Sequence, residues 1–358
     1  MTNSFNQSSI TEPRSKRDNC SNSYYRSAVG LSGFRLAWCV FALMSLFRCA
    51  THGGTVSSLI VYTGAYDGSA AVAIDTNRFV AASDEDSTLR IYRRDTGGKP
   101  LQQINLSSFL EVDPHSPETD IEAAARIGNR VFWISSHGRN KNGKEKTSRH
   151  RFFATDIVTT EHGVQFLPVG KPYEDLLADM IAAAQLKTLD LEDAAGRLPK
   201  NPGGLSIEGL ASTPDNHLLI GFRNPVSQGR ALLVPLLNPD EVIEGKHARF
   251  GAPIQLNLTG LGIRDIASWQ GEYIISAGPP EGGGPFRLFR WSGGDSLPKQ
   301  IKHVSLKGLH PEAVVIYPDK GLREFQLLSD DSTKQKITTG KAPSMLVKKQ
   351  FRSVWVTP

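Results

Sequence analysis

The feature of this 358-residue chain that most restricts its fold is a short pattern that occurs five times. Each copy opens with an acidic residue near small apolar residues, and a β-rich run ending in a polar loop follows. The acidic positions, separated by 55, 86, 57 and 47 residues, are Asp67, Glu122, Glu208, Asp265 and Glu312. A four-stranded propeller blade takes about 40 to 50 residues. The pattern therefore predicts an all-β fold, a β-propeller with five four-stranded blades.

The second gap is longer than one blade requires. Apolar residues with the i, i+3/i+4 spacing of an amphipathic helix lie within it, at Leu176, Leu177, Met180, Ile181 and Ala184. We expect a short helical insertion at about residues 173–197. Residues 151–200 also leave room for a sixth blade.

A spare strand precedes the first copy of the pattern, at residues 57–63. A ring of blades has to close its first blade on its last, and a strand donated from the other terminus does this while covering two sheet edges. We therefore predict that residues 57–63 complete the last blade. Residues 56–358 are expected to form a single propeller domain.

The first 55 residues have the composition of a leader. A polar, basic stretch containing Arg26 and Arg35 leads into the apolar run 36–47, and small or polar residues follow. This order is typical of a signal peptide, and the run is shorter than the roughly 20 residues of a membrane span. We expect residues 1–55 to be a signal peptide or an uncleaved anchor, which would be the only membrane attachment. The protein is expected to be bacterial, exported to the periplasm or the exterior, and monomeric.

Charge and cysteine usage exclude several function classes. The formal net charge of +5 falls to +1 once the first 50 residues, with six Lys+Arg and two Asp+Glu, are set aside. No basic stripe for binding a phosphate backbone remains, so nucleic acid is excluded as a partner. All three cysteines lie in the leader, which leaves the folded part without a thiol for a disulfide, a zinc site or a nucleophile.

The repeat also predicts where a functional site lies. The acidic residues begin the innermost strand of each blade, and the second strand returns antiparallel beside it, so both ends share one face. The five carboxylates expected to gather at one mouth of the channel as metal ligands are Asp67, Glu122, Glu208, Asp265 and Glu312. The loop residues expected beside them as ligand-binding residues are Asp84, Glu85, His137, Arg139, Arg223, Asn224 and Arg264.

Converging carboxylates repel one another and require a counter-charge. Ca²⁺ takes six to eight oxygen ligands, so the sequence predicts Ca²⁺ as the cofactor and a small anionic ligand at the same mouth. Two alternatives stay open, because Arg139, Arg223 and Arg264 could neutralise the acids, or the acids could accept hydrogen bonds between blades. A metal-activated water would instead make the protein a hydrolase of phosphate or carboxylate esters, with His137 and His310 as candidate general bases and no catalytic residue assigned.

Five segments resemble a bacterial family known as domain of unknown function 3616. They are Asp67-Gly68-Ser69-Ala70, Asp84 to Arg90, Ile207-Glu208-Gly209-Leu210-Ala211, Arg223-Asn224-Pro225 and Ile263 to Ala267. The resemblance implies a propeller fold, and the family has no established activity to carry over. More distantly, the Ile-Glu-Gly-Leu-Ala element is similar to that of phytase-like propellers with esterase-like activity.

Overall fold

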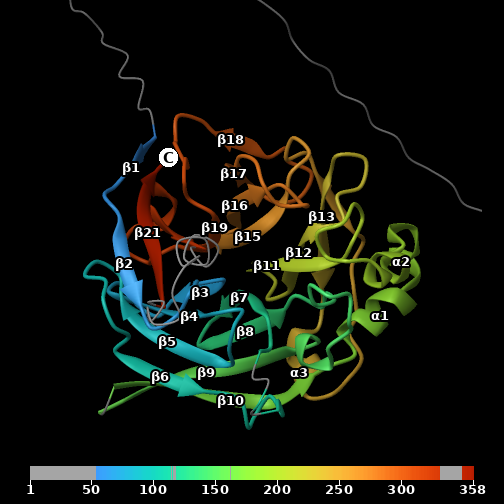
Figure 1. Cartoon of the computed structure of the whole chain (residues 1–358), viewed down its shortest axis with the longest axis horizontal. Coiled ribbons are helices and arrows are strands. Elements are labelled where there is room, and N and C mark those ends of the chain that lie inside the picture. Colours follow the sequence, from blue (N-terminus) through green and yellow to red (C-terminus); the bar gives the residue numbers. More distant parts are fainter. Residues whose placement is uncertain (1–53, 114, 116–117, 162, 331–348) are drawn as a thin grey trace, which may run out of the picture. The chain divides into compact units, whose positions relative to one another are not determined.

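Five antiparallel sheets surround one axis in the computed structural model, which describes residues 54–113, 115, 118–161, 163–330 and 349–358 (Figure 1). The innermost strands, β3, β7, β11, β15 and β19, lie nearest the centre in this view. The five-bladed, all-β propeller predicted from the repeat is confirmed. A sixth blade is not found among the described residues.

Four blades are each built from four consecutive strands, ordered here from the inside outward. The first comprises β3 (Ala70–Ala73), β4 (Arg78–Ala82), β5 (Thr88–Arg93) and β6 (Gln102–Asn105). The second comprises β7 (Ile121–Ile127), β8 (Arg130–Ser135), β9 (Phe152–Thr160) and β10 (Gly163–Tyr173). The third comprises β11 (Ser206–Ser212), β12 (Leu218–Asn224), β13 (Ala231–Leu236) and β14 (Ile254–Leu256). The fourth comprises β15 (Gly262–Trp269), β16 (Glu272–Gly278), β17 (Arg287–Trp291) and β18 (Lys299–Ile301).

The fifth blade joins the two ends of the described chain. It contains β19 (Pro311–Val315), β20 (Phe325–Ser329) and β21 (Gln350–Thr357), and both β1 (Thr55–Val56) and β2 (Ile60–Thr63) pair antiparallel with β21. The predicted closing role of residues 57–63 is therefore confirmed for the strand β2. Closure of this kind leaves the ring without an open seam between its first and last blades.

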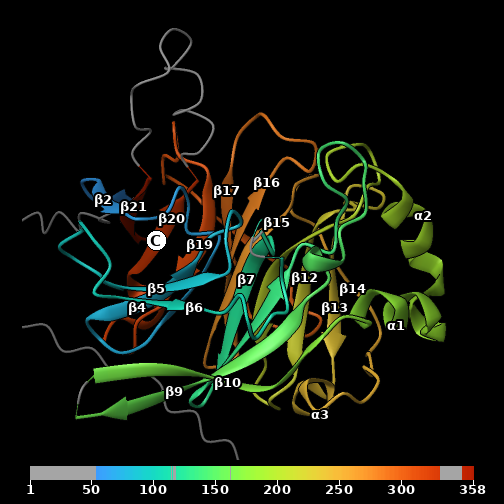
Figure 2. The same ribbon diagram turned by 60° about the horizontal axis from the view of Figure 1, so that its bottom comes forward.

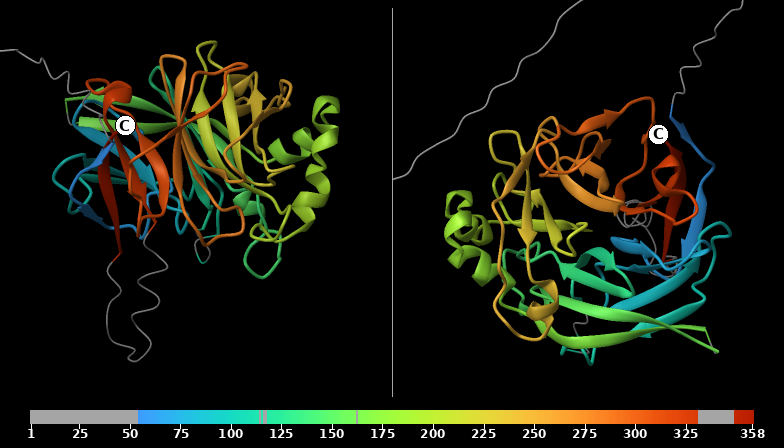
Figure 3. Two further views of the ribbon diagram at one scale, coloured as in Figure 1. Left: turned by 90° about the horizontal axis from the view of Figure 1, so that it is seen from above. Right: turned by 180° about the vertical axis from the view of Figure 1, so that it is seen from behind.

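The long second gap holds outer strands and helices instead of a blade. The β9–β10 hairpin completes the second blade and extends along its outer side (Figure 2). The predicted insertion then forms α1 (Leu176–Ala182), the 3₁₀ helix η2 (Ala184–Leu189) and α2 (Leu191–Gly196). The remaining short helices are η1 (Thr147–Arg149), α3 (Pro239–Ile243) and η3 (Gly321–Arg323). The view from behind in Figure 3 shows the insertion outside the ring of blades.

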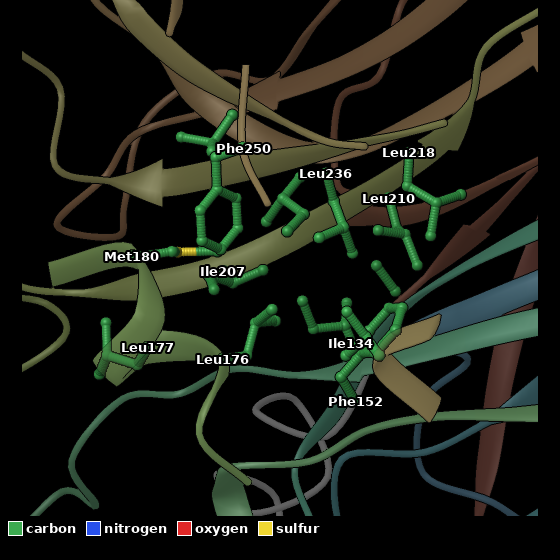
Figure 4. Packing of buried hydrophobic residues seen from close by; sticks show 14 of the residues in the cluster. Ile134, Phe152, Leu176, Leu177, Met180, Ile207, Leu210, Leu218, Leu236 and Phe250 are labelled. Carbon is green, nitrogen blue, oxygen red and sulfur yellow. The ribbon is translucent and has the colours of Figure 1, made fainter. Parts of the chain in front are cut away.

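Apolar side chains between neighbouring sheets form the core. Between the second and third blades, Phe152 and Ile207 are fully buried in a cluster that also takes in Leu176, Leu177 and Met180 of α1 (Figure 4). These three residues make the buried face that the helical spacing predicts, so α1 covers the outer junction of two blades. Burial against both sheets fixes the insertion and the loop that follows it, which reaches the candidate site.

None of the helices in the described ranges has the length and apolar character needed to cross a membrane. The predicted leader falls almost wholly on residues 1–53, which lie outside the described residues. Export and cleavage therefore stay predictions.

Candidate functional site at one end of the central channel

Four inner strands carry a β-bulge close to their first residue. The register shifts lie between residues 121 and 123 in β7, 207 and 209 in β11, 263 and 265 in β15, and 311 and 313 in β19. A bulge leaves its extra residue unpaired and redirects that side chain. The four bulged residues are Glu122, Glu208, Arg264 and Glu312, and all four line a cavity of about 770 Å³.

Two predicted metal ligands do not line this cavity. In the fourth blade the bulged residue is Arg264, and the neighbouring Asp265 faces the interface between blades. Its carboxylate accepts hydrogen bonds from the backbone N–H groups of Ile266 (2.7 Å) and Val314 (2.6 Å). Val314 belongs to the fifth blade. Asp265 therefore has the role of a hydrogen-bond acceptor between blades, which was one of the alternatives that the sequence left open.

Asp67 is held in the same buried manner within the first blade. Its carboxylate accepts hydrogen bonds from Ser69 Oγ (2.7 Å), Ser83 Oγ (3.0 Å) and the backbone N–H of Asp84 (3.2 Å). It thereby fixes the start of the loop between β4 and β5. The loop brings Asp84 to the cavity, so Asp67 is a positioning residue behind the lining.

Buried ion pairs connect three blades on one side of the cavity. Glu208 lies 2.9 Å from Arg223 Nη1 and 3.0 Å from Arg264 Nε, and Arg264 also contacts Glu312. Gly262 permits this approach, because a Cβ there would lie 1.8 Å from the carbonyl oxygen of Arg223. Burial opposes ionisation of Glu208, but the two guanidinium groups more than offset it and hold its pKa below the usual value. On this side Arg223 and Arg264 supply the counter-charge, which was the other alternative that the sequence left open.

Three carboxylates gather on the opposite side, without an equal number of cations. Asp84, Asp120 and Glu122 each offer an oxygen within 4.8 Å of the other two. Arg149 Nη1 lies 2.8 Å from Asp120 Oδ2, and Arg149 also contacts Glu118. Among the described residues, no hydrogen-bond partner is found for the buried Oδ1 of Asp84. This trio, hereafter the carboxylate cluster, carries the excess negative charge of the cavity.

The protonation of the cluster follows from its burial. Burial and the nearby charges of Asp67 and Glu122 raise the pKa of Asp84 well above its ordinary value. Burial and the charges of Asp120 and Glu208 do the same to the pKa of Glu122. The pKa of Asp120 rises to about 6 through burial, although Arg149 favours its charged form. Without a cation, burial therefore favours the protonated forms of these carboxyl groups in the folded protein.

The cavity as a whole is less acidic than the repeat predicts. Its lining contains seven carboxylates and six arginine or lysine side chains, so the charges nearly balance. The distribution is uneven, since Arg223 and Arg264 pair with Glu208 and Glu312. Within the described residues, the one ion pair found for the carboxylate cluster is that of Asp120 with Arg149. The excess of carboxylates is therefore confined to the cluster and does not extend over the whole mouth.

The predicted loop residues divide into lining and supporting groups. Asp84, Glu85, Arg139, Arg223 and Arg264 line the cavity. Asn224 instead donates its amide to the carbonyl oxygens of Pro199 (2.9 Å) and Asn201 (2.7 Å), and so holds the loop that follows the helical insertion.

His137 lies outside the lining and is buried. Its Nδ1, 2.8 Å from the carbonyl oxygen of Ser135, must carry the proton and donate it. Burial and the neighbouring His150 lower the pKa of His137 to about 3, so the ring is neutral at neutral pH. His310 does line the cavity and, of the two candidate general bases, is the one within reach of a ligand there.

Sequence reasoning missed Asp120, the most buried member of the carboxylate cluster. One signal could have found it. Ser83 follows Asp67 by 16 residues and binds it, and Ser136 follows Asp120 by 16 residues and contacts it in the same way. Asp67 is thus the counterpart of Asp120, and Glu122 has the serine Ser69 as its counterpart in the first blade.

The chain is similar to one protein family in sequence and to several solved structures in fold. The model of a family described as "Protein of unknown function (DUF3616)" matches residues 173–319. No curated protein matches significantly. A glutaminyl cyclase from Myxococcus xanthus has 10% identity and a TM-score of 0.40, with 85% of this chain and 96% of that chain covered. A GH43_1 enzyme from Xanthomonas citri has 11% identity and a TM-score of 0.41, with 83% and 89% covered.

Similarity to solved structures at this level says nothing about activity. The family match includes the segments at Glu208, Arg223 and Arg264, three of the residues that line the cavity. The resemblance to the DUF3616 family that these segments indicate is confirmed over residues 173–319.

Proposed function

We propose that the protein binds a divalent cation, Ca²⁺ in first place, at the carboxylate cluster formed by Asp84, Asp120 and Glu122. The observation that supports this most is the convergence of three carboxylate oxygens within 4.8 Å, one of them on Asp84, whose buried Oδ1 has no hydrogen-bond partner among the described residues. Such a group is costly to bury unless a proton or a cation accompanies it. The cluster is therefore a site for one or the other.

The donor set favours a hard cation. All three side chains offer oxygen, and no cysteine or histidine belongs to the cluster. Oxygen donors suit Ca²⁺, Mg²⁺ and Mn²⁺, and Ca²⁺ tolerates the irregular geometry and the mixture of carboxylate and water ligands that a cluster from two blades provides. Ser136, which lines the same wall, offers a further oxygen.

A small anionic ligand is proposed to bind beside the cation. Lys141 and Lys200 line the same cavity, and neither pairs with a carboxylate in the part of the chain that the structure describes. A cation and two lysines around a cavity of about 770 Å³ favour a phosphate or carboxylate group on a small molecule, since pockets of about 300–1,000 Å³ take such ligands.

The cation and the anionic ligand are proposed to bind without catalytic turnover. A metal-bound water could also hydrolyse an ester, so p-nitrophenyl phosphate and p-nitrophenyl acetate are to be tested with Ca²⁺, Mg²⁺ and Mn²⁺ after removal of bound metal by chelator. No metal-dependent release of nitrophenol is expected. Release that disappears in Glu122→Gln would instead support the hydrolase that the sequence left as an alternative.

The Asp120→Asn and Glu122→Gln variants are expected to lose the stabilisation that Ca²⁺ gives the wild-type protein. At a free Ca²⁺ concentration 100 times the Kd, binding to the native state alone adds about 2.7 kcal/mol to the free energy of unfolding. Thermal denaturation of the full chain with Ca²⁺ and with chelator measures this. Glu85→Gln is the matched control, because Glu85 lines the cavity outside the cluster. An equal Ca²⁺ shift in all four proteins contradicts the proposal.

The Ca²⁺ shift is also expected to grow with pH. The pKa values of Asp84, Asp120 and Glu122 are raised in the folded state, that of Asp120 to about 6. Their bound protons therefore stabilise the folded protein at low pH, and this stability is lost as pH rises through the raised pKa values. Ca²⁺ must displace these protons. The difference in Tm with and without Ca²⁺ should be small at pH 5 and large at pH 8, and a difference that is constant over this range argues against the cluster as the site.

A further inference from the structure

A second cavity lies at the opposite end of the channel. Its lining comes from the last residues of the five inner strands and from residues just after them, and its volume is about 350 Å³. Four of these strands, β7, β11, β15 and β19, place residues near their starts at the candidate site. The strands run side by side around the axis in Figure 1, so their two ends mark two separate mouths. Residues that could carry chemistry at this second mouth are few, and the wall is formed mainly by alanine and other apolar side chains.

Arg126 is the one charged residue among those that line this second cavity. Its Nε donates to the carbonyl oxygen of Gly128 (2.7 Å), and its Nη1 donates to those of Ala73 (2.8 Å) and Ile74 (2.7 Å). These contacts fix the guanidinium between the first and second blades. They supply no full negative charge.

No carboxylate of the described residues forms an ion pair with Arg126. The nearest acidic influence is Asp75, which is already bound at 2.7 Å by Arg78. Burial lowers the pKa of Arg126, as expected for a cation that is partly removed from water without a counter-ion. An anion that entered the cavity would find a fixed guanidinium whose Nη2, within the described residues, has two N–H groups left to donate, and a carboxylate oxygen can accept from them.

The remaining residues of the cavity wall determine which kind of ligand could bind beside Arg126. The alanine side chains and the ring of Trp269 offer apolar surface, and the hydroxyl groups of Ser212 and Ser268 lie 2.8 Å apart and share one hydrogen bond. A polar ligand body would lose its hydration here and gain few hydrogen-bond partners. The volume lies near the lower end of the range for small-molecule sites.

We propose that this second mouth binds a small monocarboxylate with an apolar body, its carboxylate on Arg126 and its body against the alanines and Trp269. The proposal is independent of the cation at the other mouth. It requires a ligand of one negative charge, of about the size of benzoate, and excludes sugars and polyphosphates from this cavity.

The probe is benzoate, compared with benzyl alcohol as a neutral ligand of similar size, in titration calorimetry on the full-length protein with and without Ca²⁺. Benzoate is expected to bind at least 10-fold more tightly than benzyl alcohol, equally in both conditions. Equal affinities for the two compounds, or benzoate binding that needs Ca²⁺, would overturn the proposal.

Two variants locate the binding. Arg126→Gln keeps an amide donor for the carbonyl oxygens and is expected to abolish the preference for benzoate. Arg93→Gln, which replaces an exposed arginine of the first blade outside the cavity, is expected to keep it. Ser212→Leu places a larger side chain in the cavity and leaves Arg126 unchanged. It is expected to abolish binding of both compounds, with a cooperative thermal unfolding transition retained as proof of folding. Benzoate binding that survives in Ser212→Leu contradicts the assignment, even where Arg126→Gln does not fold.

Discussion

Replacing Tyr62 by alanine is expected to lower the free energy of unfolding by about 3–5 kcal/mol, the range for deleting a buried aromatic side chain. Tyr62 lies on the closing strand β2, is fully buried and stacks on Phe351 of β21 with ring centroids 5.2 Å apart. Its hydroxyl donates to the carbonyl oxygen of Arg94 (2.5 Å) and accepts from Gln326 Nε2 (3.0 Å). The truncation therefore removes packing and hydrogen bonds at the one place where the ring is closed by pairing of the two ends.

Urea unfolding of the full chain measures this loss. Val61→Ala is the matched control on the same strand, because Val61 is 41% exposed and its truncation should change the free energy by at most about 0.5 kcal/mol. Tyr62→Phe, which loses only the hydroxyl, should fall between the two. A loss below about 1 kcal/mol for Tyr62→Ala would mean that β2 does not hold the ring closed in solution.

Replacing Arg264 by methionine is expected to cost a similar amount, about 3–5 kcal/mol, because breaking a buried ion pair leaves an uncompensated charge. Glu208 would keep Arg223 alone, and Glu312 would lose its contact with Arg264. Glu208 has a lowered pKa in the folded state, so its ionisation stabilises the protein above the ordinary pKa of glutamate. That stability is lost as pH falls through the lowered pKa. The difference between variant and wild type should accordingly shrink in acid.

Arg290→Met is the control in the same blade. Arg290 pairs with Glu272 at 2.5 Å, but its side chain is 48% exposed, and exposed pairs contribute at most about 1 kcal/mol. Chemical denaturation of both variants at pH 7 compares them directly. A cost for Arg264→Met no greater than that for Arg290→Met would show that the network is not a stabilising element of the channel.

The repeat predicted the blades well because the fold imposes it on the sequence. Inner strands meet around a narrow axis and need small residues, as in Ala70–Ala73 and Ile121–Ile127, and each returns through a tight turn at a similar spacing. The closing strand followed from the same logic, since a ring must pair its ends. These features recur from blade to blade, so they can be recognised in a single sequence.

The site was predicted only in part because its key features are local and not periodic. The same bulge occurs in four blades, but the fourth blade has Arg264 at the bulged position, so aligning the copies on their acidic residues placed Asp265 there by mistake. Left-handed backbone conformations at Asp120 (φ 55°) and His137 (φ 54°) also redirect side chains, and the pattern of residue types does not indicate them. The sequence therefore predicted several of the residues that line the cavity, but not the group of three carboxylates.

The most direct test of the cation site is a crystal structure of the protein grown with Mn²⁺ in place of Ca²⁺, with anomalous diffraction used to locate the metal. The proposal predicts one strong anomalous peak within about 2.6 Å of carboxylate oxygens of Asp84, Asp120 and Glu122, the upper bond length for such cations. An empty carboxylate cluster at millimolar Mn²⁺, or a peak among Glu208, Arg264 and Glu312 instead, would contradict it.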